Sequence, residues 1–229
     1  MGIRSGNETS NDPSYGLTRL HLVDMLIDTL KEHTSERNYT KETIEHISQS
    51  DSSIVILTDK GHVFSVGKFV INHPALFESV KLTGEDTLSP MFLNPYIEKW
   101  LKGDRVVWVG HTNHLFLILT QNNRLFYTLD GEAVEFDVNL GDDSVKEIAY
   151  GLEHVFVTTK KKKIYSFGHF SYGSLGNAVE NRARLRAEEV RIDFTPGDSL
   201  EKVYCGYHRT MVLTKNGQVW ACGWGKSFV

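Results

Sequence analysis

The chain of 229 residues has only two cysteines, Cys205 and Cys222, too few for a disulfide framework. We expect both to be reduced, which favours an intracellular location in the cytoplasm or nucleus. No apolar signal segment lies near Met1. The net charge is −4 and the pI is near 6.2, so the chain has no excess of positive charge. Specific binding to nucleic acid and attachment to an acidic membrane are therefore not expected.

Motifs for catalysis and metal binding are also missing. Residues 225–227 read GKS, like the end of a phosphate-binding loop, but Trp220 stands where that motif needs its first glycine. Residues 173–176, GSLG, lack the spacing of a nucleophile elbow. His111 and His114 have no further ligand residues nearby at a metal-binding spacing. We therefore expect no enzyme activity, cofactor, metal or small-molecule substrate.

The sequence does contain a unit that occurs four times, aligned on a threonine: Thr58, Thr120, Thr159 and Thr214. Each threonine follows an apolar run, a turn position comes three residues later, and a second apolar pair begins soon after. Nine residues after the threonine stands a glycine in three copies, while the second copy has Leu129. Three copies also have a histidine five or six residues before the threonine, namely His114, His154 and His208.

Each unit is predicted to form a β-hairpin. In the last copy, Asn216-Gly217 is a dipeptide that favours a two-residue turn, and this register places Cys222 opposite Met211. The turn position of the third copy is Lys162, which is strained in the left-handed conformation that the turn needs. The first strand of each hairpin is apolar throughout rather than alternating, as expected for a sheet covered on both faces.

Two further strands complete each of the last two units. For the third unit we predict strands at 133–138, 146–149, 155–158 and 163–167, and for the last unit at 188–192, 202–205, 210–213 and 218–222. Repeated four-stranded antiparallel sheets that cover each other's faces form a β-propeller. The predicted fold class is therefore all-β, with four-stranded blades.

Two stretches carry a resemblance to a known family: 150–176, with its tail GHFSYGSLG, and 205–225, CGYHRTMVLTKNGQVWACGWG. They resemble the repeats of the regulator of chromosome condensation family, well over the last two-fifths of the chain and loosely over 44–131. The resemblance implies a seven-bladed propeller that serves as a binding platform. The positions that carry the repeat structurally are Gly61, Gly67, Gly151, His154, Gly168, Gly173, Gly176, Gly206, His208, Gly217 and Gly223.

The resemblance also implies a range of functions. Complete propellers of this family act as nucleotide-exchange factors for small GTPases, bind chromatin, or belong to ubiquitin ligases and trafficking scaffolds. No motif for any of these activities can be carried over to this sequence. The leading prediction is a scaffold or regulatory module that binds a protein partner, and regulation of a small GTPase is the alternative. A second alternative is the substrate-recognition part of a ubiquitin-ligase assembly.

The predicted organisation has three parts. Residues 1–14 are expected to be disordered, 15–46 to be helical, and 47–229 to form a partial propeller with repeats centred near 54–67, 115–129, 154–168 and 208–223. An amphipathic helix over 17–30 either packs on the propeller or binds a partner. Four repeats form an incomplete ring, so the chain is either a fragment or truncated product, or its open edge associates with a partner or second copy.

Two groups of residues are candidates for partner contact. Phe92 and Trp100 lie in an aromatic-rich insertion within 68–103, where they either contact a partner or cover a blade face. Arg182, Arg184 and Arg186 alternate along a segment that either meets an acidic surface or stays solvated.

Overall fold

The computed structural model describes residues 28–29, 42–69, 90–112, 114–129, 132–136, 138, 140–169, 172–176 and 184–225. Most of the predicted helix at 17–30 lies outside these residues, and only Asp28 and Thr29 are seen to be helical. Residues 1–14 also lie outside them. The division of the chain before residue 42 therefore stays a prediction.

The described strands form four antiparallel sheets, which we call the first to fourth blades in chain order. The first blade contains β1 (Ile44–Gln49), β2 (Ser53–Thr58), β3 (Val63–Gly67) and β4 (Met91–Phe92). The second contains β5 (Val106–His111), β6 (Phe116–Thr120), β7 (Leu125–Leu129) and β8 (Glu132–Glu135). The third contains β9 (Val145–Tyr150), β10 (His154–Thr159), β11 (Ile164–Gly168) and β12 (Arg184–Glu189). The fourth contains β13 (Leu200–Cys205), β14 (Arg209–Thr214) and β15 (Val219–Gly223).

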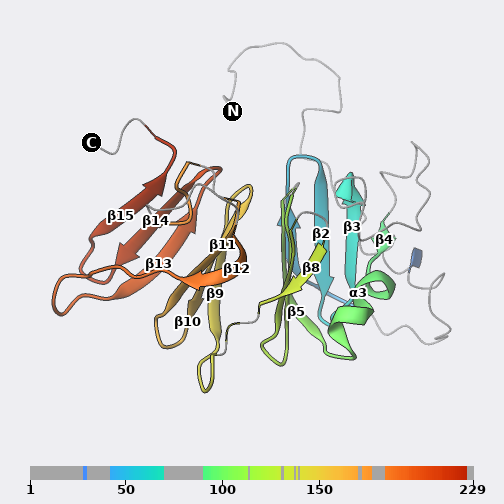
Figure 1. Ribbon diagram of the computed structural model, residues 1–229. Helices are drawn as coiled ribbons and strands as arrows, with labels where there is room; N and C mark the ends of the chain where they lie inside the picture. Colours follow the sequence, from blue (N-terminus) through green and yellow to red (C-terminus); the bar gives the residue numbers. More distant parts are fainter. Residues whose placement is uncertain are drawn as a thin grey trace, which may run out of the picture.

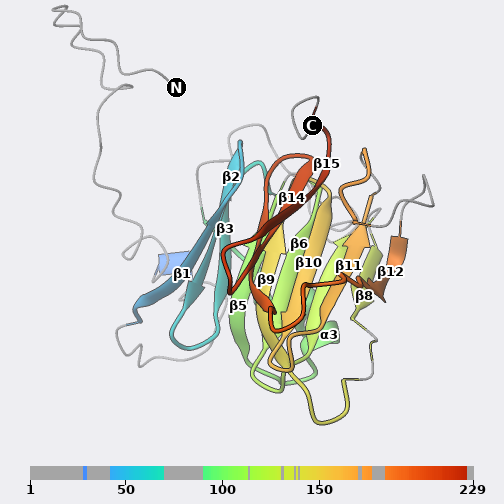
Figure 2. The same ribbon diagram turned by 90° about the vertical axis from the view of Figure 1, so that its left-hand side faces the viewer.

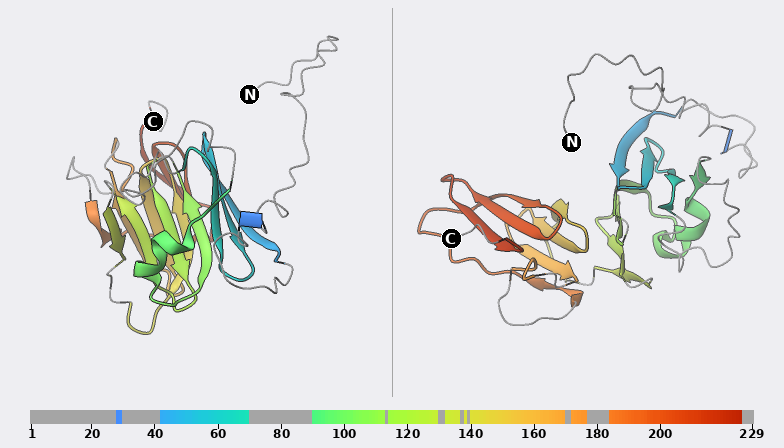
Figure 3. Two further views of the ribbon diagram at one scale, coloured as in Figure 1. Left: turned by 90° about the vertical axis from the view of Figure 1, so that its right-hand side faces the viewer. Right: turned by 90° about the horizontal axis from the view of Figure 1, so that it is seen from above.

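The blades follow one another in space as they do in sequence (Figure 1). Seen from above, the first and fourth blades lie at opposite ends of the row (Figure 3). When the fourth blade faces the viewer, the other blades are seen behind it (Figure 2). Strands β1 and β2 contact β5, and β9 and β10 contact β13. The predicted all-β propeller with an incomplete ring is confirmed.

The assignment of outer strands to blades was wrong. We predicted that 133–138 and 188–192 belong to the hairpins that follow them, but β8 pairs with β7 and β12 pairs with β11. Each outer strand thus completes the hairpin before it. In the first blade, the outer strand is β4, which lies within the stretch 68–103 that holds the aromatic-rich insertion.

The hairpin turns are one residue longer than the two-residue turn we predicted. In the fourth blade, Gly217 N–H donates to Thr214 O and Thr214 N–H donates to Gln218 O, which leaves a three-residue loop. This loop type places its last residue in the left-handed region. The turn residues have φ angles of 84°, 62°, 64° and 82° at Gly61, Asn123, Lys162 and Gly217. The register shifts accordingly, and Cys222 lies opposite Thr210 rather than Met211.

The repeated threonine has a local role at these turns. The Thr214 hydroxyl accepts the N–H of Gln218 at 3.1 Å, and the other three threonines do the same four residues ahead. The threonine side chains are nearly inaccessible, with exposed fractions of 0–2%. A hydroxyl at this position satisfies an N–H that the loop would otherwise leave unpaired.

An acidic residue also recurs in all four units, a regularity that the sequence analysis did not recognise. It stands sixteen residues before the repeat threonine, as Glu42, Asp104, Asp143 and Asp198. The Asp143 carboxylate accepts the N–H groups of Ser144 and Lys161 at 2.8 and 3.0 Å, and Asp198 binds Ser199 and Asn216 likewise. Burial raises the pKa of Asp143, but hydrogen bonds from Thr159 and these N–H groups outweigh it and hold the pKa below its usual value.

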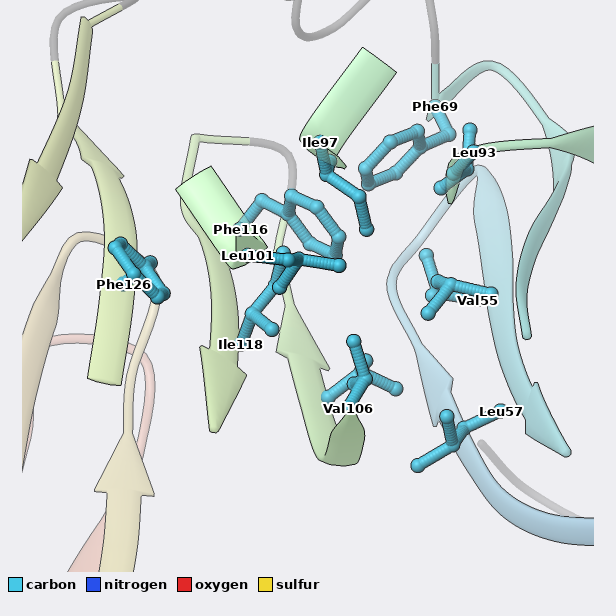
Figure 4. Packing of buried hydrophobic residues seen from close by; sticks show 12 residues of the cluster. Val55, Leu57, Phe69, Leu93, Ile97, Leu101, Val106, Phe116, Ile118 and Phe126 are labelled. Carbon is cyan, nitrogen blue, oxygen red and sulfur yellow. The ribbon is translucent and has the colours of Figure 1, made fainter. Parts of the chain in front are cut away.

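The apolar core lies between neighbouring blades. Between the first and second blades, Val55 and Leu57 face Val106 and Phe116 (Figure 4). Helix α3 (Asn94–Leu101) covers this core with Ile97 and Leu101. The buried residues of the cluster are Val55, Leu57, Val63, Phe69, Leu93, Ile97, Leu101, Val106, Val109, Phe116, Ile118 and Phe126. Equivalent clusters join the second blade to the third and the third to the fourth.

The aromatic insertion takes part in this packing. Phe92 is only 6% exposed and lies 5.3 Å from the ring of Phe64, centroid to centroid. Phe92 therefore packs on the first blade, and its role in partner contact stays a prediction. Trp100 is partly buried and packs against the core between the first and second blades. The Trp100 ring thus also contributes to the packing between these blades.

Candidate functional site

The inner hairpin loops of all four blades meet at one end of the propeller, which we call the loop face. They line a cavity of about 230 Å³, to which the blades contribute Asp51, Thr112, Leu152 and Tyr207 in turn. These loops connect β1 to β2, β5 to β6, β9 to β10 and β13 to β14. Loops held by a rigid scaffold are where propellers usually bind.

Hydrogen bonds fix these loops relative to one another. The Thr112 hydroxyl donates to Leu152 O at 2.8 Å, and Leu152 N–H donates to Tyr207 O at 3.1 Å. The Ser48 and Tyr150 hydroxyls lie 3.1 Å apart, which joins the first blade to the third. The loop face is therefore held in one arrangement by contacts between blades.

Two buried histidines strengthen these connections. His111 lies between the hydroxyls of Ser48 and Ser53, at 2.9 Å from Nδ1 and 3.1 Å from Nε2. His154 Nε2 lies 3.0 Å from the hydroxyl of Thr210 in the next blade. Burial lowers the pKa of His154 to about 4, so its ring is neutral at pH 7.

The three repeat histidines differ in their environment. Relative to the repeat threonine, His114 and His208 occupy the same position, but His154 stands one residue later. His114 is exposed and lies 3.9 Å from the Glu153 carboxylate. His208 contacts the aromatic rings of the loop face. Of the three, His154 has a buried position and bridges two blades.

Gly151 allows the third and fourth blades to approach closely. A β-carbon at this position would lie 2.3 Å from Gly206 O and 2.2 Å from His154 Cε1. Both distances are far shorter than a van der Waals contact, so any side chain would force the two loops apart. The contact between blades thus explains the glycine at position 151, whereas a β-carbon at its repeat counterpart, Gly206, would have open space around it.

The GHFSYGSLG segment anchors the loop face to the fourth blade. Ser174 O accepts a hydrogen bond from the Thr210 hydroxyl at 2.9 Å and one from Cys222 Sγ at 3.4 Å. The Ser166 hydroxyl donates a hydrogen bond to Leu175 O at 2.9 Å. Tyr172, in the same turn, has a φ of 58°, which is uncommon for a bulky residue. The anchored turn keeps this tyrosine pointing outward, with 64% of its surface exposed.

Tyr172 belongs to a group of rings that we call the aromatic patch: Tyr172, Tyr207, His208 and Trp224. The ring of Tyr172 lies 5.5 Å from His208 and 5.7 Å from Trp224, and Tyr207 lies 4.5 Å from His208. Tyr207 and Trp224 are 65% and 57% exposed. The patch gathers residues from three separate segments of the chain.

The predicted arginine group is only partly described. Arg182 lies outside the described residues, whereas Arg184 and Arg186 belong to β12 rather than to a loop. Arg186 is exposed on this strand. Their role in partner contact stays a prediction.

The described residues offer neither a metal-binding cluster nor a membrane-spanning helix. Within the described residues, no three histidine, cysteine or acidic side chains come together in a way that suits a metal ion. No helix in that part of the chain has the length and apolar character needed to cross a membrane. Both cysteines are free.

Blades joined in series, with loops gathered at one end, define a β-propeller of the repeat type. Residues 201–227 match the Regulator of chromosome condensation (RCC1) repeat. The predicted resemblance is confirmed, and the match to the family model covers one repeat of this chain.

Known proteins show the same relationship over larger parts of the chain. The human "RCC1-like G exchanging factor-like protein" is 29% identical over 101 residues, which cover 43% of this chain and 22% of that protein. Mouse "Serine/threonine-protein kinase Nek9" is 24% identical over 187 residues, 80% of this chain and 13% of that protein. The chain thus spans less than a quarter of either relative.

A solved structure has the same fold. The crystal structure of Prp20p from Saccharomyces cerevisiae, described with its binding to Gsp1p and histones, superimposes with a TM-score of 0.60 at 19% identity. The match covers 83% of this chain and 48% of Prp20p. At this identity the likeness concerns the fold.

Proposed function

We propose that this chain is a non-enzymatic module that binds a protein partner through the aromatic patch on its loop face. The carrying observation is the exposure of Tyr172, Tyr207 and Trp224, each more than half accessible, around His208. Tyrosine and tryptophan are enriched among the residues that dominate binding energy at protein interfaces. We place this module inside the cell, as the sequence leads us to expect.

The rigidity of the loop face supports this proposal. The bond between Leu152 and Tyr207 and the anchored turn around Tyr172 hold the rings before a partner arrives. Binding then costs less conformational entropy than it would with mobile loops. Backbone strain at Tyr172 is also of the kind that accompanies functional sites.

The experiment compares the whole chain with a variant that carries Tyr172→Ala, Tyr207→Ala and Trp224→Ala. Each protein is used as bait in extracts of its source cells, with quantitative mass spectrometry of the captured proteins. A partner of the loop face is enriched by the original chain and lost from the variant. Ile47→Ala is the control, because Ile47 is 51% exposed but lies outside the patch. Equal capture by all three baits would contradict the proposal.

Regulation of a small GTPase is the second candidate function. It is favoured by the name of the human relative, which describes an exchanging factor. In this case, adding the chain to purified small GTPases would accelerate release of a labelled guanine nucleotide. An unchanged release rate across a panel of such proteins would eliminate this candidate and leave the proposed binding module untouched.

A further inference from the structure

The hairpin turns at the end of the propeller opposite the loop face carry a group of lysines, which we call the lysine cluster: Lys160, Lys162, Lys163 and Lys215. We propose that this cluster binds an acidic segment of a protein partner, whose carboxylates lie against the ammonium groups. The inference goes beyond the proposed function, because it assigns a second binding surface that shares no residue with the aromatic patch.

The cluster spans two neighbouring blades. Lys160, Lys162 and Lys163 lie in the turn between β10 and β11, and Lys215 lies in the turn between β14 and β15. Both turns contact Ser199. Lys162 Nζ donates to the Ser199 hydroxyl at 2.9 Å, and Lys215 N–H donates to Ser199 O at 2.9 Å. These bonds hold the two turns side by side, so their positive charges form one surface.

The protein does not neutralise this charge itself. The lysines of the cluster are exposed, and within the described residues none of them forms an ion pair. Lys161 differs from its neighbours, because its Nζ contacts the Asp142 carboxylate. The Asp143 carboxylate, at the same turn, accepts the N–H groups of Ser144 and Lys161. Ammonium groups gathered in this way favour a partner with carboxylates at matching positions.

The backbone at Lys162 gives a second, independent indication. Its φ is 64°, and the other blades have Gly61, Asn123 and Gly217 at this turn position. Glycine and asparagine adopt the left-handed conformation at a lower cost than lysine does. A turn that only faced water would be more stable with glycine here, so we attribute the lysine to its ammonium group. Strained residues of this kind are found preferentially at functional sites.

The surroundings of the cluster favour a protein segment over a nucleic acid. The chain has a net charge of −4, which repels a long polyanion outside the cluster. The side chain of Asp142, next to the cluster, is 85% exposed and would face the phosphates of a duplex. Neither turn contains an aromatic side chain on which bases could stack. A short acidic peptide can contact the lysines alone.

The probe is a fluorescein-labelled oligoglutamate peptide, which is titrated with the full chain while fluorescence anisotropy reports binding. An oligoglutamine peptide of the same length is the control. We expect saturable binding of the glutamate peptide at low ionic strength and much weaker binding at about 0.5 M salt, because salt screens exposed charges. No saturable binding, or equal binding of both peptides, would overturn the proposal.

Variants of the protein test the location. Lys162→Gly removes one ammonium group and relieves the backbone strain, so peptide binding should weaken about threefold while the fold stays intact. Lys160→Gln combined with Lys163→Gln should weaken binding about tenfold. Lys60→Gln is the matched control, because Lys60 lies in the corresponding turn of the first blade, 3.7 Å from the Glu42 carboxylate. It should bind the peptide unchanged, and equal binding by all variants would overturn the proposal.

Two further measurements separate related outcomes. Tyr207→Ala should bind the glutamate peptide unchanged, so a failure of the aromatic patch and a failure of the lysine cluster can be told apart. A labelled DNA duplex of random sequence is titrated under the same conditions, and we expect it to bind more weakly than the peptide. Tighter binding of the duplex that Lys162→Gly weakens would assign the cluster to phosphate groups, and would overturn the assignment to an acidic protein segment.

Discussion

His154 Nε2 lies 3.0 Å from the Thr210 hydroxyl, so a buried imidazole ties the third blade to the fourth. The same hydroxyl donates to Ser174 O at 2.9 Å. A single threonine therefore connects the buried histidine with the segment that anchors Tyr172. The structure of the loop face depends on this junction. Because the His154 imidazole can take up a proton, the stability of the fold depends on pH.

The first prediction concerns that dependence. Burial lowers the pKa of His154 from 6.5 in the unfolded chain to about 4 in the folded protein. The folded state thus disfavours the proton, so the contribution is fully present above pH 6.5 and is lost as pH falls towards 4. Linkage gives a loss of about 2 kcal/mol between pH 7.5 and 5. Urea denaturation at both pH values measures it. His154→Gln is the control, and an equal loss in this variant would contradict the assignment.

The second prediction concerns the glycine nine residues after the repeat threonine. At Gly168 (φ 114°), a β-carbon would lie 2.3 Å from Glu153 O. Gly168→Ala should therefore lower the free energy of unfolding by about 3 kcal/mol or more. Gly141 also has a positive φ, of 58°, but has open space around it, so Gly141→Ala should cost only about 1 kcal/mol. Equal losses in urea denaturation would show that the backbone conformation, rather than the close contact, sets the cost.

The third prediction uses the strained turn of the third blade. Lys162 is exposed and has a φ of 64°. Since a left-handed conformation strains residues other than glycine, Lys162→Gly should raise the free energy of unfolding by about 0.5 kcal/mol after the entropy of glycine is included. Lys160→Gly should have the opposite sign, because its φ is not in this region. Thermal denaturation of the two variants measures the change in stability. A loss of stability in both would refute the strain argument.

The fourth prediction concerns the cysteines. Burial raises the pKa of Cys205 to about 12 and raises that of Cys222 as well. Because the thiolate is the reactive form, both should react with iodoacetamide at pH 8 at least tenfold more slowly in the folded chain than in urea. Mass spectrometry of the alkylated chain follows each site. Rapid reaction of Cys205 without denaturant would contradict its buried environment.

The sequence was sufficient for the hairpins because the threonine, the turn residue and the apolar pair recur together. It was insufficient for the outer strands, since 133–138 lies between two hairpins and pattern alone does not say which one it joins. For this segment, the lengths of the connections favour the preceding hairpin: only two residues separate β7 from β8, whereas nine separate β8 from β9. Short connections favour pairing with the nearer hairpin.

The predicted register of the last hairpin was wrong because of a side-chain hydrogen bond at the turn. Asn216-Gly217 favours a two-residue turn, but the Thr214 hydroxyl accepts a hydrogen bond from the N–H of Gln218 and so stabilises a three-residue loop. The aromatic patch could not be predicted at all. Tyr172, Tyr207 and Trp224 come from three segments, and only the packing of the third blade against the fourth brings them together.

Site-specific photo-cross-linking tests the central claim most directly. A photoreactive amino acid replaces Tyr207 in the patch, or Lys161 at an exposed hairpin turn, and the chain is irradiated in its source cells. The proposed function predicts a discrete adduct with a protein partner from position 207 and none of that mass from position 161. Irradiation that gives no adduct at 207, or the same adduct from both positions, would contradict binding through the loop face.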